Sequence, residues 1–149
     1  MTYRAIEFRL RLVVSVLFLA APVSAGEALD HTQGGDGIIG AWRGSSLCVD
    51  RKALPACNDE EVVYEIVAKP GQSDAVTVKA DKIVDGKRVP MGALDFVRDA
   101  KDGSWATNIE TPSVHALWRL AVGGTTMTGT MTLLPSNVVV RRMDLKRSE

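Results

Sequence analysis

Alternation of apolar and polar residues is the feature that most constrains this chain. In segment 126–133 every second residue is a threonine, and the residues between them are Met, Gly, Met and Leu. Segments 62–67 and 76–79 follow the same two-residue period. Branched and aromatic side chains favour extended backbone, and this period buries one face of a strand while the other meets water. The pattern predicts an all-β protein, because no segment after residue 37 shows the apolar stripe and caps of a helix.

Turn-forming residues interrupt the alternation at seven places, which are 50–59, 70–73, 85–86, 99–103, 111–113, 123–124 and 135–137. Asp-Gly and Gly-Gly pairs favour tight hairpin turns because both tolerate positive φ. Short connections favour an antiparallel meander, and eight strands can close into an up-and-down barrel without free edges; a two-sheet β-sandwich is the alternative. The strands are expected at 38–48, 60–69, 75–84, 88–98, 104–110, 114–122, 125–134 and 138–146.

The same period assigns the side chains that face the barrel interior. It places Arg141 inside and Arg142 outside, although the fourth and last strands each offer two competing apolar faces. The expected inner set is Val62, Tyr64, Ile66, Val76, Val78, Leu94, Phe96, Trp105, Ile109, Ala116, Trp118, Leu120, Met127, Met131, Leu133, Val139, Met143 and Leu145.

Residues 1–25 have the three parts of a secretory signal peptide. Three arginines precede the uncharged apolar run 12–21, and small residues surround Ala25 at the expected cleavage site. The run is too short for a membrane span, which needs about twenty residues, so an uncleaved anchor is the weaker alternative. Residues 26–37 are small and polar, which predicts a flexible leader before a barrel domain at 38–149. The signal is typical of a bacterial exported protein, which predicts a periplasmic or secreted location.

The two cysteines agree with export. Cys48 and Cys57 enclose a short polar loop, and such a pair forms a disulfide in an oxidising compartment. Closing a loop of this size contributes about 2.5 kcal/mol in the chain-entropy description. The spacing differs from the C-x-x-C of redox sites, and no histidine lies nearby in sequence, so we expect a structural disulfide.

Charge and motif content exclude several function classes. The chain has 18 basic and 18 acidic residues, and removing residues 1–25 leaves 15 and 17, a net charge of −2. This balance gives no attraction for nucleic acid or anionic membranes. The sequence has no Gly-x-Ser-x-Gly, phosphate-loop or His-Glu-x-x-His motif. We therefore expect no enzymatic activity, no metal, no cofactor, no nucleic-acid partner and no membrane span, and we expect a monomer.

Both ends of the expected barrel resemble a known family. Gly40-Ala41-Trp42 opens the first strand and Arg141-Arg142 lies on the last, a pattern similar to that of lipocalin-like, calycin-type barrels. The resemblance implies that the first and last strands are neighbours and that Trp42 plugs the closed end of the barrel. It also implies that Arg141 or Arg142 packs over the Trp42 indole, where a guanidinium gains a cation–π contact.

The interior of an eight-stranded barrel is either filled by side chains or holds one small ligand. Few polar groups are expected to point inward, so a ligand should be apolar or carry one acidic group facing Arg141. The expected function is binding or sequestering of a small apolar ligand. The alternative is a protein-interaction module, or a protease-inhibitor-like barrel of the cell envelope with a filled core, because secreted metalloprotease inhibitors have a similar size. The candidate ligand-binding residues are Trp42, Tyr64, Trp105, Trp118 and Arg141.

Overall fold

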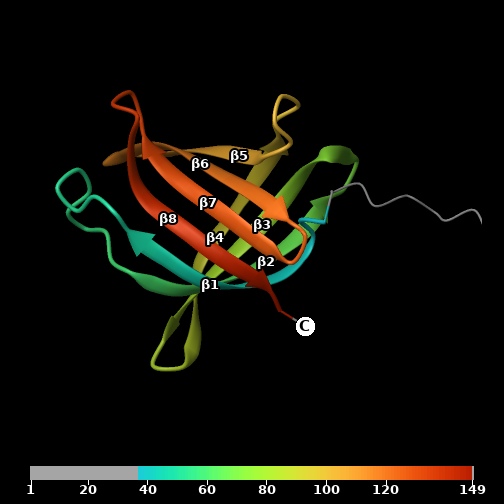
Figure 1. Cartoon of the computed structure of the whole chain (residues 1–149), viewed down its shortest axis with the longest axis horizontal. Helices are drawn as coiled ribbons and strands as arrows, with labels where there is room; N and C mark the ends of the chain where they lie inside the picture. Colours follow the sequence, from blue (N-terminus) through green and yellow to red (C-terminus); the bar gives the residue numbers. More distant parts are fainter. Residues whose placement is uncertain (1–36, 149) are drawn as a thin grey trace, which may run out of the picture.

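A computed structural model describes residues 37–148, which form a closed antiparallel barrel of eight strands in sequence order (Figure 1). The last strand pairs with the first, so the predicted up-and-down barrel is confirmed and the sandwich alternative is wrong. The signal peptide and nearly all of the predicted leader lie outside the described residues. The strands are β1 (Gly40–Cys48), β2 (Glu60–Lys69), β3 (Gln72–Val84), β4 (Lys87–Arg98), β5 (Trp105–Thr111), β6 (Val114–Gly123), β7 (Thr126–Leu133) and β8 (Val138–Arg147).

The strand ends follow the local turn chemistry. Asp85 and Gly86 adopt φ values of 50° and 75° between β3 and β4, as the tight hairpin turns with two positive-φ residues require. Gly71 and Gly124 likewise have positive φ between β2 and β3 and between β6 and β7. These positions depend on neighbours in the chain alone, which explains why the expected strand bounds agree closely with the observed ones.

The packed core fills the end of the barrel where β1 begins and β8 ends, which we call the closed end. Trp42 is 0% exposed there, and its Nε1 donates a hydrogen bond of 2.7 Å to the carbonyl oxygen of Ile38. Most of the expected inner residues are buried, but Val140 is fully buried where Val139 was expected, because the β7–β8 register shifts between Met131 and Thr132. The buried cluster is Ile38, Trp42, Val62, Tyr64, Ile66, Val76, Val78, Ala80, Phe96, Trp105, Leu120, Met127, Met143 and Leu145.

Arg147 is the residue that covers Trp42, so the prediction of Arg141 or Arg142 in this role is wrong. The guanidinium carbon of Arg147 lies 4.4 Å from the centroid of the indole, and Nη1 donates to the carbonyl oxygen of Ile39 at 2.8 Å. In the β1–β8 ladder Trp42 pairs with Arg147. An antiparallel ladder sets the start of one strand against the end of the other, which carries Arg141 away from Trp42.

The close approach of β1 and β8 requires a glycine. Gly44 pairs with Leu145, and a Cβ at Gly44 would overlap the carbonyl oxygen of Asp144. Backbone atoms cannot move aside as a flexible side chain can, so the seam that closes the barrel excludes larger residues at this position.

Substituting Arg147→Ala should change the fluorescence of Trp42 and lower the free energy of unfolding by about 0.5–1 kcal/mol, the value of an exposed cation–π contact. Arg142 is exposed on the same strand and serves as the matched control. The measurement is emission and urea denaturation in a Trp105→Phe, Trp118→Phe background, which leaves Trp42 as the sole tryptophan. A larger effect of Arg142→Ala than of Arg147→Ala would contradict this arrangement.

Candidate functional site

The eight strands close into a barrel, but most of the β4–β5 ladder is missing, which leaves an opening in the hydrogen-bonded wall. Strands β4 and β5 pair only through Val97 with Ala106 and Arg98 with Trp105, whereas the other neighbours pair along most of their lengths. The β3–β4 hairpin instead extends beyond the barrel, at the bottom of Figure 1. Met91 and Leu94 are therefore 41% and 36% exposed, although Leu94 was expected in the core.

A cavity of about 350 Å³ lies inside the barrel and is lined by β4 next to this opening. β5 contributes no lining residue. The walls are mostly apolar and aromatic, and one side carries a small polar cluster of Ser46, Glu60 and Arg141. The remaining lining residues are Tyr64, Val78, Ala80, Met91, Gly92, Ala93, Leu94, Phe96, Trp118 and Met131.

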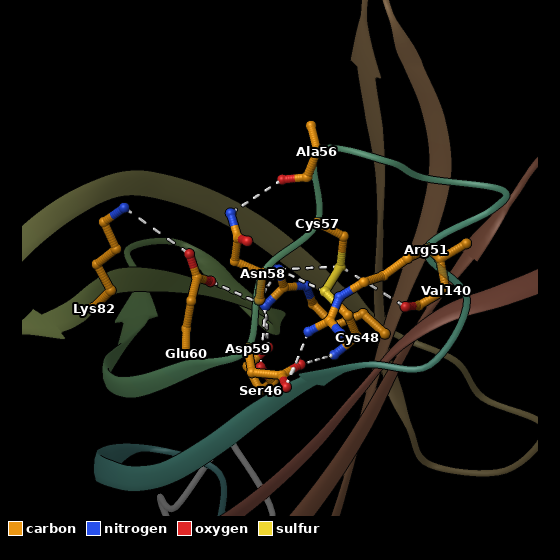
Figure 2. A network of polar contacts seen from close by, with 11 residues as sticks. Ser46, Cys48, Arg51, Ala56, Cys57, Asn58, Asp59, Glu60, Lys82 and Val140 are labelled. Atoms are coloured by element: carbon orange, nitrogen blue, oxygen red, sulfur yellow. Dashed lines mark hydrogen bonds and ion pairs between the residues drawn. A yellow bond between two sulfur atoms is a disulfide. The ribbon is translucent and has the colours of Figure 1, made fainter.

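Arg141 donates hydrogen bonds to both other members of the polar cluster, Ser46 and Glu60, which are labelled in Figure 2. Its side chain is 14% exposed, and Nη1 donates to Ser46 Oγ at 2.8 Å and to Glu60 Oε2 at 2.9 Å. Nη2 donates to the carbonyl oxygen of Asn58 at 2.9 Å and lies 3.4 Å from Cys57 Sγ. A buried guanidinium requires a compensating charge and hydrogen bonds. Glu60 supplies the charge, and Ser46 Oγ and the carbonyl oxygen of Asn58 accept further hydrogen bonds.

The predicted Cys48–Cys57 disulfide is present, with the two Cα atoms 5.9 Å apart. Asp59 braces the loop that it closes, since its carboxylate accepts a 2.8 Å hydrogen bond from Cys48 N and pairs with Arg51 at 3.1 Å. The Cys48 backbone hydrogen bond, followed by the Arg51 charge, holds the pKa of Asp59 below its ordinary value. Together with Arg141, these contacts attach the loop to the barrel end opposite Trp42.

Three aromatic side chains, Tyr64, Phe96 and Trp118, line the cavity. The Trp118 ring meets Tyr64 and Phe96 edge to face, with centroid distances of 5.8 and 5.7 Å. Burial raises the pKa of the Tyr64 hydroxyl well above its ordinary value, so this group is neutral.

Three of the five candidate ligand-binding residues line one cavity, namely Tyr64, Trp118 and Arg141. Trp42 and Trp105 do not line it, because both are fully buried in the packed core. Ser46 and Glu60 were missed by the sequence analysis, although Ser46 shares the inward period of Trp42 and Glu60 shares that of Tyr64. Met91 belongs to the second of the two competing apolar faces of the fourth strand, and it lies at the register shift between Ala80 and Asp81, which the sequence did not predict.

Comparison with known proteins finds no matching family model, no matching curated protein and no matching solved structure. Within residues 37–148 there is no helix long and apolar enough to cross a membrane. The same residues contain no group of three or more His, Cys, Asp or Glu side chains placed to hold a metal ion. The function is therefore inferred from the residues of the barrel.

Proposed function

We propose that this protein binds a small apolar molecule in the cavity lined by β4, β6, β7 and the polar cluster. The cavity itself is the observation that carries the proposal. Its volume of about 350 Å³ falls in the range of small-molecule pockets, and its walls combine apolar and aromatic side chains with a few fixed polar groups. Met91 and Met131 suit such a wall, because the unbranched thioether adapts to irregular ligands.

The polar cluster argues for an uncharged ligand. The sequence left open an apolar ligand or one with an acidic group facing Arg141, and Glu60 already places a carboxylate 2.9 Å from Arg141. A ligand carboxylate would have to displace Glu60 or lie beside it, and two carboxylates near one guanidinium repel each other. The ligand we propose is therefore apolar and neutral, with Arg141 holding the disulfide loop against the barrel.

We further propose that the chain is an exported, periplasmic or secreted member of the lipocalin-like barrels. The Gly-x-Trp segment at residues 40–42 lies at the closed end, and Arg147 stacks on Trp42, as the family resemblance implies for a terminal arginine. The N-terminal signal-peptide pattern and the disulfide support export.

An interaction module is the second candidate, because β4 leaves most of one edge without a strand partner. An extended segment of a partner protein can pair with such an edge by main-chain hydrogen bonds. The large apolar residues exposed on β4 are Val89, Met91, Leu94 and Val97.

Titration with the uncharged fluorophore N-phenyl-1-naphthylamine tests the proposed ligand site. We expect saturable binding with a blue-shifted emission, and Ala80→Phe, which places a ring in the cavity, should weaken it about tenfold or more. Ala121→Phe introduces the same side chain at an exposed position and should leave the affinity unchanged. Absence of saturable binding, or equal affinity in the Ala80→Phe variant, would refute the ligand site. Binding of an extended partner segment to β4 should survive Ala80→Phe.

A further inference from the structure

Trp118 carries an unpaired buried donor at the cavity wall. Within residues 37–148, its Nε1 is the buried side-chain polar atom that has no hydrogen-bond partner. A buried N–H without a partner has lost its hydrogen bonds to water and gained none in the protein, which costs free energy. Such groups are therefore rare in native proteins and call for an explanation. Trp42 shows the usual solution in the same barrel, since its Nε1 donates to the carbonyl oxygen of Ile38.

The two side-chain acceptors of the polar cluster are engaged with Arg141. Glu60 Oε2 accepts a hydrogen bond from Arg141, and Ser46 Oγ accepts one from the same guanidinium. The rings of Tyr64 and Phe96 meet Trp118 edge to face, and neither residue forms a hydrogen bond with Nε1. Across the β6–β7 ladder its partner is Met131, whose thioether is a weak acceptor. None of these contacts involves Trp118 Nε1, which therefore stays an unpaired buried side-chain donor within residues 37–148.

We infer that the ligand of this cavity carries one uncharged hydrogen-bond acceptor, such as a ketone, ester or ether oxygen, and that Trp118 Nε1–H donates to it. This inference rests on the proposed function and names the ligand class: an apolar body with a single neutral acceptor. A site with one unmet donor selects strongly for a ligand that supplies the missing partner. A carboxylate acceptor is disfavoured, because Glu60 shares the cavity and its charge would oppose a second anion.

Reaching the donor requires a small movement of the ring. Nε1 is inaccessible to solvent, while Trp118 as a whole is only half-buried and packs against the core. Its neighbour Met131 has three rotatable bonds and lines the same cavity, so it can yield space at little cost. Tilting of the indole toward an entering acceptor exchanges an unpaired N–H for a hydrogen bond.

Two probes of nearly the same shape test this inference on the oxidised protein that begins after the expected cleavage site. The probes are 2-acetylnaphthalene, which carries a carbonyl oxygen, and 2-isopropenylnaphthalene, which has a CH₂ group in its place. Trp118→Phe keeps an aromatic ring and removes the N–H. We expect this change to weaken binding of the ketone about five- to tenfold more than binding of the alkene. Trp105→Phe, which alters a buried indole away from the cavity, should affect both probes equally.

Nuclear magnetic resonance of the ¹⁵N-labelled indoles gives a second readout. The Trp118 indole proton should move downfield when the ketone binds and stay in place with the alkene, while the Trp42 indole, already paired with Ile38, should not move. Equal losses for both probes in Trp118→Phe would overturn the acceptor inference and leave apolar binding intact. A Trp118 proton already hydrogen-bonded to water before any probe is added, and unmoved by the ketone, would also overturn it. Failure of both probes to bind the unaltered protein would overturn the proposed function together with this inference.

Discussion

Trp42→Ala is expected to lower the free energy of unfolding by about 3–5 kcal/mol, the range for removing a large aromatic side chain from a core. Trp42 is fully buried at the closed end, so truncation leaves a cavity where the surrounding strands are held by their ladders. It also leaves the carbonyl oxygen of Ile38 without its donor and removes the ring beneath Arg147. Urea denaturation followed by far-ultraviolet circular dichroism measures the change.

Trp42→Phe separates these contributions. Phenylalanine retains most of the apolar volume but cannot donate a hydrogen bond to Ile38. Trp42→Phe should therefore lower the free energy of unfolding, but by less than Trp42→Ala does. Val84→Ala, at an exposed position of the β3–β4 hairpin, should cost less than about 0.5 kcal/mol and controls for strand truncation in general. A loss below about 1 kcal/mol for Trp42→Ala would show that this ring does not hold the closed end.

Replacing both cysteines by serine should lower the free energy of unfolding by about 2–5 kcal/mol, as is usual when a small exported domain loses its disulfide. The Cys48–Cys57 bond restricts the unfolded chain, and in the folded state it holds the loop whose Asn58 carbonyl accepts from Arg141. Part of the loss should therefore appear as a weakened Arg141–Glu60 cluster and not only as loop entropy.

Reduction of the unaltered protein provides the matched measurement. Dithiothreitol should move its urea midpoint to that of the double-serine variant and leave the variant itself unchanged. Protein purified from an oxidising compartment should contain no titratable thiol after denaturation without reductant. Two titratable thiols in such material, or a urea midpoint of the unaltered protein that dithiothreitol does not change, would contradict the role assigned to the Cys48–Cys57 bond.

Local chemistry made most of the barrel predictable. Alternation identifies a strand from a few consecutive residues, and Asp85-Gly86 encodes its turn through the φ values that these two residues tolerate. The disulfide was predictable because Cys48 and Cys57 are close in sequence. The inward direction of Tyr64, Trp118 and Arg141 followed from the same period and places all three on one cavity. None of these inferences needs to know which strand residue lies opposite which.

Tertiary structure decided whatever depends on register and on the spacing of strands. By itself, the sequence determined the strands, the turns, the disulfide and the inward faces of the strands other than β4 and β8. The choice of Arg147 as the partner of Trp42, and of Glu60 as the partner of Arg141, came from the ladders of β1 with β8 and β2. The opening beside β4 arises because β4 and β5 pair over only two residues each, and the unpaired donor of Trp118 depends on which side chains meet inside the barrel. A strand's own residues specify which way a side chain points, but its partner depends on distant segments that meet only when the barrel closes.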